Sequence, residues 1–455
     1  MLCLSCAKLN AIRSDLLWNM CQKSLVIIHC GCCCSTDIRL LPSQRLEQEV
    51  GAMHELLPWT IVKYHSASPT QKAILRKAGF QCISMVNFLN TDLLPEIYSS
   101  ASTDLEPLLL TALDSLASHP GVHLTQPLKV FVDGKLHRVS TLVDSTSQLM
   151  QALFAKGRGY AGYDLLPAQY AQGNCLATLR SHGLAHDDLP DPRCFLACAD
   201  QFVRLYEDKD RNADMSKHSR MLLDMLQRNV DAYQTITAAV AWEETSHLIS
   251  TKPIFVKAAV VSPYESSPSP VLVSLEDSED YSHHRLVASV VAVTEATLGD
   301  TTELRAKLGL PAGPQAVHVV AHLLHTAQVR NEGLQAGQNP GPLNKLIQED
   351  VQKAYSFIIG VVSHYLTKGE HRELAKLTKK LAEAPWVMVQ NPQRFVAPCD
   401  LIFEIEEDLE HGKPFCPPLF VCHYPVKVSG TDMAIVIWQS CFACAPASTA
   451  LHDYC

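Results

Sequence analysis

The chain has 455 residues, of which 47% are apolar and 19% charged, and its formal net charge is −9. This composition can form hydrophobic cores and argues against wholesale disorder, while the acidic balance disfavours a strongly basic nucleic-acid binder or a polybasic membrane protein. No uninterrupted run of about 18 apolar residues occurs, so we expect no membrane span.

The 17 cysteines concentrate at the two ends of the chain. Neither end shows sustained helical or strand periodicity, so we predict a disordered Cys-rich extension over residues 1–40 and an irregular tail over 431–455. The start of the chain lacks the basic region and apolar block of a secretory signal. A reducing, cytoplasmic location with free thiols is therefore the simpler interpretation.

A short motif recurs along the middle of the chain. Residues 75–79 (Leu-Arg-Lys-Ala-Gly) return as 179–183 (Leu-Arg-Ser-His-Gly), and 304–309 is a looser copy. Each copy ends an apolar-periodic stretch with glycine, the residue that most readily closes a helix in the left-handed conformation. We predict a helix that ends near each glycine, with further helices over 85–94 and 194–205.

Two segments are typical of strands that lead into tight turns. Residues 130–135 run from β-rich residues into Asp133-Gly134, a strong turn dipeptide, and 386–392 repeat the pattern with Asn-Pro. Apolar stripes at helical spacing predict amphipathic helices over 105–116 and 346–365.

Together these patterns predict an α+β fold of small repeated helix and hairpin units in two or more subdomains, with unstructured ends. Residues 256–285 include a Pro/Ser-rich run and an acidic run, so we predict an exposed loop or linker there. The two predicted repeat domains then span 41–255 and 286–430.

Three histidines form the main candidate metal site. His318, His322 and His325 are spaced i, i+4 and i+7, so they share one face of a predicted helix, and neutral imidazoles placed in this way can ligate zinc. The helix has no glutamate that would act as general base in an H-E-x-x-H pattern. The alternative interpretation is a helix whose Val and Leu residues pack inward while its histidines face solvent.

Two other motifs have a structural alternative. His182, His186, Cys194 and Cys198 would complete a tetrahedral zinc site, but the spacing is unusual, and core cysteines on a helix with loop histidines are the favoured interpretation. Residues 157–162 match G-x-G-x-x-G but follow a predicted helix rather than a strand, so we predict a loop. We find no complete catalytic or nucleotide-binding motif.

Several segments resemble the repeating region of sacsin across residues 41–425. They are Ala73–Phe80 leading to Phe88–Leu89 and Leu94–Ile97, Val130–Asp144 followed by Leu149–Phe154, Leu176–Gly183 with Asp187–Phe202, and a W-V-x-V…F-x-x-P element in Trp386–Val389 with Phe395–Pro398. Sacsin is a very large cytoplasmic protein that resembles a co-chaperone, and its repeats begin with an ATP-binding module followed by an α+β segment. The resemblance implies that this chain corresponds to the second part.

The ATP-binding motif of that family is not matched. The nearest approach to E-x-x-x-N-[AS]-x-D is 208–215, where Asp replaces the glutamate and Met215 replaces the final aspartate, and D-x-G-x-G does not occur. We predict a charged loop over 208–215 and carry over no site residues.

The leading hypothesis is a non-enzymatic, sacsin-like scaffold or co-chaperone fragment. It would bind unfolded clients and the seventy-kilodalton heat-shock chaperone through apolar surface, without nucleic acid or cofactor. The first alternative is a zinc-binding module or zinc-dependent hydrolase that uses His318, His322 and His325. The second is a truncated product without independent activity.

Overall fold

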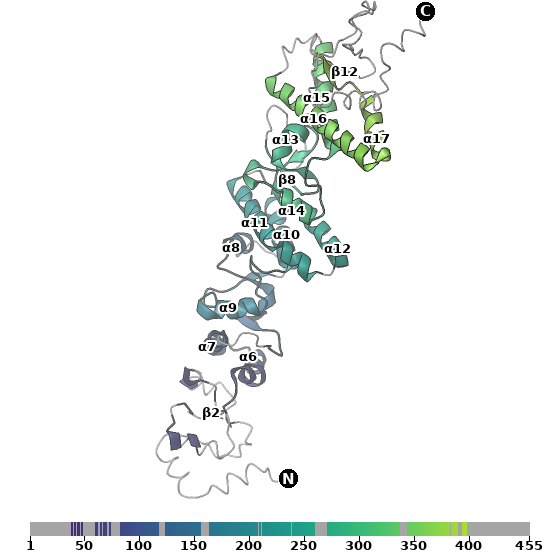
Figure 1. Ribbon diagram of the computed structural model, residues 1–455. Helices are drawn as coiled ribbons and strands as arrows, with labels where there is room; N and C mark the ends of the chain where they lie inside the picture. The colour runs from purple at the N-terminus through teal and green to yellow at the C-terminus, as the bar shows by residue number, and fades with distance from the viewer. Residues whose placement is uncertain are drawn as a thin grey trace, which may run out of the picture. The chain divides into compact units, whose positions relative to one another are not determined.

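The structure is a computed structural model (Figure 1). It describes residues 82–117, 123–155, 163–207, 209–210, 212–237, 239–259, 271–336, 344–382, 384–389 and 394–397, with short stretches between 38 and 73. The chain divides into two compact units, Met1–Leu189 and Pro190–Cys455. Both combine helices with short two-stranded pairings, which confirms the predicted α+β class.

The elements of the first unit follow one another closely along the chain. They are β1 (Ile38–Arg39), β2 (Thr60–Ile61), α5 (Met85–Asn87), the π-helical η3 (Phe88–Leu93), α6 (Leu94–Ser100), η4 (Thr103–Leu105), α7 (Glu106–Leu116), β3 (Lys129–Val132), β4 (Lys135–Arg138), η5 (Val139–Thr141), β5 (Leu142–Val143), α8 (Gln148–Phe154), β6 (Asp164–Leu165) and α9 (Gly173–Ser181).

The core of this unit forms where α7 packs on α9. The predicted apolar stripe over 105–116 is buried in full. The predicted hairpin is also present, since β3 and β4 pair antiparallel around Asp133 and Gly134. Both turn residues have positive φ (48° and 77°), as the hairpin turn that favours Asp-Gly requires.

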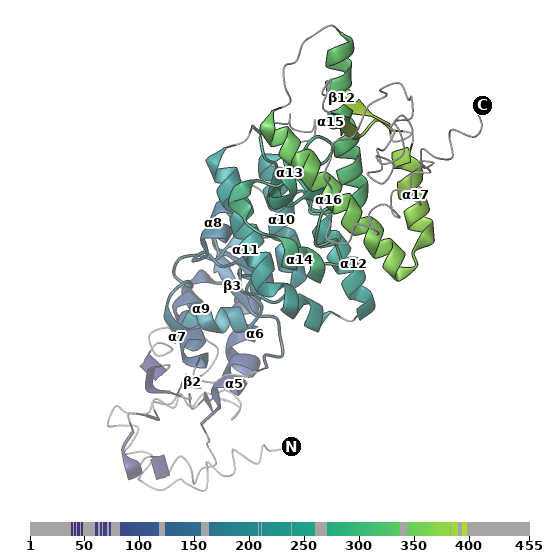
Figure 2. The same cartoon turned by 45° about the horizontal axis from the view of Figure 1, so that its top comes forward.

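The second unit is richer in long helices (Figures 1 and 2). Its elements are α10 (Pro192–Tyr206), α11 (Ala213–Ile236), α12 (Ala239–Ser250), β7 (Phe255–Val256), β8 (Leu272–Val273), β9 (Ser278–Glu279), η6 (Tyr281–His283), α13 (His284–Val287), β10 (Ala292–Val293), η7 (Ala296–Leu298), α14 (Thr302–Lys307), α15 (Ala316–Gln335), α16 (Lys345–Lys368), α17 (His371–Ala382), β11 (Val387–Val389) and β12 (Arg394–Val396).

Helix α15 packs against α16, and the hairpin β11–β12 lies on α15. Val319, Val320 and Leu323 of α15 are buried with Val351, Ala354, Ile358 and Val362 of α16 in one cluster that also takes in Trp386. The helix predicted over 346–365 is thus confirmed as α16, as the helix predicted over 105–116 is confirmed as α7 in the first unit. Leu346, at the start of the predicted stripe, remains 45% exposed.

A strand–aspartate–helix unit occurs twice, at 142–184 (the first copy) and 278–310 (the second copy). In the first copy β5 pairs in parallel with β6, and in the second β9 pairs in parallel with β10. A buried aspartate follows the first strand in each copy, Asp144 and Asp280. Each accepts the backbone N–H of the residue two positions later, Thr146 or Ser282. The repeat suggested by the sequence is therefore also a structural one.

Both copies end in the same way. Gly183 and Gly309 have positive φ (95° and 77°) after α9 and α14. The next N–H closes the helix end, from Leu184 to the carbonyl of Leu179 and from Leu310 to that of Arg305, which is the 6→1 bond of a Schellman motif. The glycine prediction is confirmed at these two positions, and the third copy of the motif, 75–79, lies outside the described residues.

The predicted linker over 256–285 is wrong for its described part. Strand β7 pairs antiparallel with β8, and Val273, Leu275 and Glu279 are buried. The boundary between the two compact units along the chain also falls at Leu189/Pro190 rather than near residue 256. The composition was misleading for two reasons. The short apolar runs that flank the Pro/Ser-rich segment pair with each other, and two residues of the acidic run, Glu279 and Asp280, are buried and accept hydrogen bonds. Residues 260–270 lie outside the described part.

The predicted charged loop over 208–215 is also only partly correct. The side chain of Asn212 accepts the N–H of Met215 and caps α11, so residues 213–215 belong to a helix. Within the described residues no helix combines the length and apolarity needed to cross a membrane.

Candidate functional site

An open apolar groove lies on the second unit. Its walls are Pro314 and Ala316, at the start of α15, and Phe357, Gly360, Val361, His364 and Tyr365 of α16. It is open to solvent rather than enclosed, and its volume is about 410 Å³. A Cβ atom built on Gly360 would meet no atom within 4 Å, so the groove is open at this residue.

Helix α16 presents two apolar faces. One face, with Ala354 and Ile358, packs into the core against α15. The other, with Phe357, Val361 and Tyr365, is only partly buried. Residues four apart lie on the same side of a helix, so this second face continues along the groove for about two turns.

The opposite wall of the groove is held by a buried carboxylate. Glu279 Oε1 accepts the backbone N–H of Gln315 at 3.3 Å and contacts His318 Nδ1 at 3.0 Å. Gln315 is the N-cap of α15 and lies between the two wall residues Pro314 and Ala316. The second copy of the strand–aspartate–helix unit therefore fixes the position where α15 begins.

Glu279 is ionised in this environment although its side chain is only 1% exposed. Burial opposes its ionisation, but nearby His283 and the bonds from His318 and Gln315, together with the charge of Arg305, outweigh burial and lower its pKa to about 2. Arg305 is itself buried and donates to the carbonyls of Ser278 (2.9 Å) and Pro311 (3.1 Å). The carboxylate and the guanidinium thus compensate each other inside the unit.

The three histidines of the zinc hypothesis lie on α15 as predicted, but in three separate environments. His318 contacts Glu279, His325 is exposed, and His322 is buried with Nδ1 accepting from the Ser289 hydroxyl at 2.6 Å. They do not appear among the described groups of three potential ligands that lie within 4.8 Å of one another. The alternative, in which all three face solvent, is also wrong for His322.

Burial of His322 has an electrostatic consequence. Desolvation, with a smaller contribution from the charge of His325, lowers the pKa of His322 to about 4. At neutral pH the imidazole is therefore uncharged, and it links α15 to the loop after α13 through Ser289.

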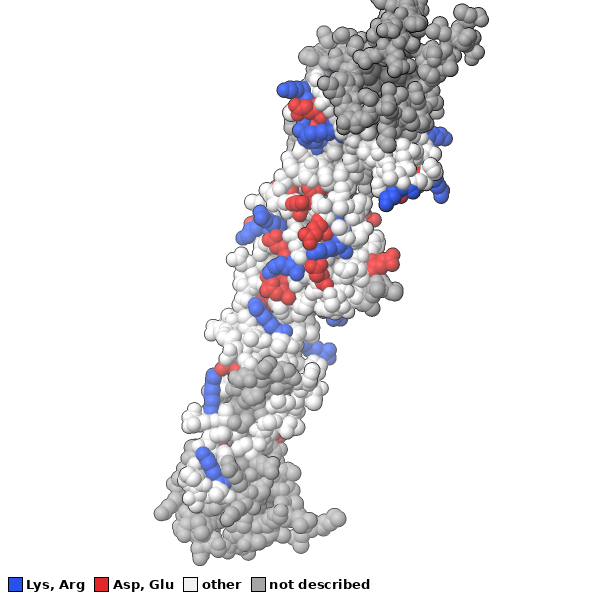
Figure 3. Space-filling model, viewed as in Figure 1, with Lys and Arg blue, Asp and Glu red and all other residues white. Residues whose placement is uncertain are grey.

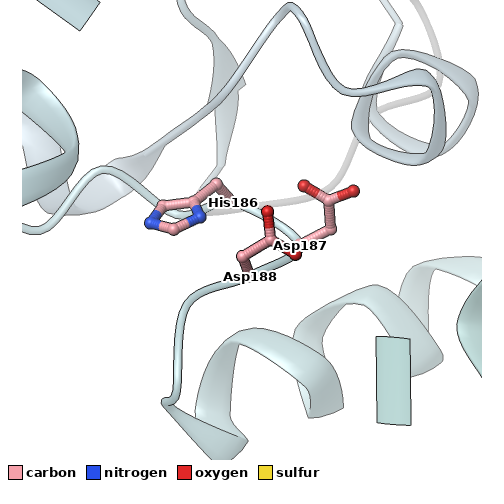
Figure 4. Close-up of side chains that lie close together, drawn as sticks. All are labelled: His186, Asp187 and Asp188. Carbon is pink, nitrogen blue, oxygen red and sulfur yellow. The ribbon is translucent and has the colours of Figure 1, made fainter. Parts of the chain in front are cut away.

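One potential ligand group occurs in the described residues, in the first unit. His186, Asp187 and Asp188 bring one ligand atom each within 4.8 Å of the others (Figure 4). They are consecutive residues of a turn that is closed by the N–H of Leu189 on the carbonyl of His186, so their proximity follows from the turn itself. Cys194 and Cys198, predicted partners of His182 and His186, are buried on α10 and belong to no such group among the described residues.

Comparison of the chain with protein-family models, with curated proteins and with solved structures finds no match. The likeness to sacsin remains a prediction from the sequence motifs.

The groove was not predicted from the sequence. Its α16 wall has a signal, because Phe357, Val361 and Tyr365 repeat at spacing i, i+4, i+8 beside the core stripe. The other wall comes from residues about 45 positions earlier, and only the tertiary structure brings the two together.

Proposed function

We propose that this chain is a non-enzymatic, sacsin-like scaffold or co-chaperone that binds protein partners in chaperone-assisted folding or protein quality control in the cytoplasm. The groove between the start of α15 and α16 is the observation that carries the proposal. It offers partly exposed aromatic and aliphatic side chains, which is the surface that an apolar segment of another protein would cover.

The geometry of the groove fits a peptide segment. Its walls are a helix face with a four-residue period and a rigid helix start, an arrangement in which an extended or helical segment can place one or two apolar side chains. Unfolded clients and the seventy-kilodalton heat-shock chaperone are the partners that the sacsin-like motifs suggest.

The test is whether the full chain suppresses aggregation of a heat-unfolded client, measured by light scattering with and without ATP. We expect suppression that does not depend on ATP. Gly360→Leu fills the groove and should abolish the effect, whereas Gln352→Leu adds the same side chain to an exposed position of α16 about two turns away and should not.

Two results would contradict the proposal. One is no suppression by the full chain together with no binding to the seventy-kilodalton chaperone. The other is suppression that Gly360→Leu leaves unchanged, since the binding surface would then lie elsewhere on the chain.

A further inference from the structure

We propose that the segment which enters the groove is acidic as well as apolar, and that its carboxylates bind the exposed basic face of α17. This inference rests on the proposed function, because it names the chemistry of the partner for the same groove.

Helix α17 is amphipathic, and its polar face is basic although the chain as a whole is acidic. Its apolar residues Leu374, Leu377 and Leu381 pack on the core of the second unit. Its other face is basic and exposed, and consists of Arg372, Lys376, Lys379 and Lys380. Between residues 368 and 382 the chain has five Lys or Arg and two Glu, a local excess of positive charge in a chain of net charge −9.

Most of this basic face has no partner within the described residues. Lys376 pairs with Glu373 at 2.7 Å. Arg372, Lys379 and Lys380 make no ion pair or side-chain hydrogen bond with any described residue. Elsewhere in the unit a lysine does form an ion pair with another element, as the half-buried Lys307 does with Asp231. Figure 3 shows basic side chains at the edge of the molecule where Figure 1 places α17.

The basic face follows the groove directly along the chain. His364 and Tyr365 line the groove in the last turns of α16, and the exposed Lys368 lies about 6 Å beyond His364 along the same helix. The left-handed Gly369 (φ 71°) then turns the chain into α17, where the basic face begins at Arg372. A peptide that extends from the groove past this end of α16 would therefore come near Lys368 and the start of the basic face.

These two features together favour an acidic, amphipathic peptide. An apolar groove contributes nothing to binding a phosphate backbone, and a basic face alone gives no place for apolar anchors. Complementary charge would mainly raise the association rate and the selectivity for acidic segments.

The probe is a fluorescent 16-residue peptide with Leu and Phe anchors four residues apart, followed by four Glu. A matched peptide replaces the four Glu by Gln, and a second replaces the anchors by Ser. Anisotropy with the full chain at low salt should show about tenfold tighter binding of the Glu peptide than of the Gln peptide, with most of that difference lost in about 0.5 M salt, where charges are screened.

Variants separate the two parts of the surface. The double reversal Lys379→Glu with Lys380→Glu should remove the preference for the Glu peptide and leave the Gln peptide unaffected. The matched control Lys217→Glu with Arg220→Glu, which reverses two exposed charges on α11, should leave the preference intact. Gly360→Leu should weaken both peptides.

Equal binding of the Glu and Gln peptides, or a preference that survives the α17 reversal, would overturn the acidic partner while leaving the groove as a protein-binding site. Binding of both peptides by the Gly360→Leu variant would instead overturn the proposed function. Salt-dependent binding to vesicles with anionic lipid, without binding to any peptide, would show that the basic face serves a membrane surface and would overturn the inference.

Discussion

The two copies of the strand–aspartate–helix unit have the same backbone hydrogen bonds but different buried side chains. Leu166 N–H bonds to the carbonyl of Val143 in the first copy, and Thr294 N–H bonds to that of Glu279 in the second, so Val143 and Glu279 occupy equivalent positions. The matching hydrogen bonds at the helix ends likewise make Leu179 equivalent to Arg305. At these two positions the first copy thus has the buried apolar residues Val143 and Leu179, where the second has the buried charged residues Glu279 and Arg305.

This difference gives only the second copy directed bonds from these two positions to the start of the following helix. Val143 and Leu179 provide hydrophobic packing, which has no direction. Glu279 and Arg305 provide directed bonds to Gln315, His318 and the carbonyl of Pro311, and these residues set the start of α15. Replacing buried charged groups by apolar residues is often neutral or stabilising, so we interpret these two charged residues as a means of positioning rather than of stability.

The largest expected effect comes from removing the buried guanidinium. Arg305→Leu leaves the buried carbonyls of Ser278 and Pro311 without their donor and removes the nearby positive charge that favours ionised Glu279, so we expect the second unit to lose roughly 3–5 kcal/mol of unfolding free energy. The double change Arg305→Leu with Glu279→Val restores the apolar residues of the first copy at both positions and should cost less than the sum of the two single changes. Urea unfolding with hydrogen exchange on α14 and α15 measures this coupling, and strictly additive losses would contradict it.

The second unit should also lose stability in acid. The pKa of His322 is about 4 in the folded state against 6.5 as its ordinary value, so the unfolded chain binds a proton first as the pH falls below 6.5. The resulting loss in the free energy of unfolding grows to about 3 kcal/mol near pH 4.

Glu279 adds a second loss at lower pH. Its folded pKa of about 2 lies below the ordinary 4.5, so its contribution is present above pH 4.5 and declines as the pH falls toward 2. Thermal melts between pH 7 and 3 should show both steps, and His322→Gln should remove only the upper one. Melting of α15 that does not change between pH 6.5 and 4 would show that His322 titrates normally.

The aspartates should behave alike in both copies if the units are equivalent. Asp144→Ala leaves the N–H of Thr146 and the side chain of Arg180 without their acceptor. Asp280→Ala does the same to the N–H groups of Ser282 and Thr301. Each change should cost its own unit about 2 kcal/mol. Hydrogen exchange measures the stability of each unit separately. A loss of stability in only one of the two variants would show that the copies are not equivalent.

The smallest effects concern Gly360, inside α16, and Gly369, which follows the last residue of that helix. Gly360 lies inside the helix with open space around it, so Gly360→Ala should stabilise the second unit by about 0.5–1 kcal/mol. Gly369→Ala should destabilise it by about 1 kcal/mol, because residue 369 needs positive φ to end the helix. Melting temperatures that move in the same direction for both variants would contradict this assignment.

Local patterns predicted the elements whose cause is local. The Asp133-Gly134 hairpin, the stripe over 105–116 and the helix ends at Gly183 and Gly309 all follow from turn chemistry or periodicity within a few residues.

The predictions failed where a residue finds its partner far along the chain. Glu279 suggested an exposed acidic run, but Gln315 and His318 meet it 36 and 39 residues later. His322 suggested a solvent-facing or metal-bound imidazole, whereas Ser289 of another element holds it. The basic face of α17 was visible in the sequence as Arg372, Lys376, Lys379 and Lys380 at helical spacing, but its significance depends on the groove beside it.

The central claim, that the groove of the second unit binds protein segments, is tested most directly by hydrogen exchange of the full chain with and without an unfolded client. We predict that the client slows exchange in residues 357–365 of α16 and at the start of α15, and that Gly360→Leu removes this protection. Protection confined to the first unit, or the same protection in the Gly360→Leu variant, would contradict the account.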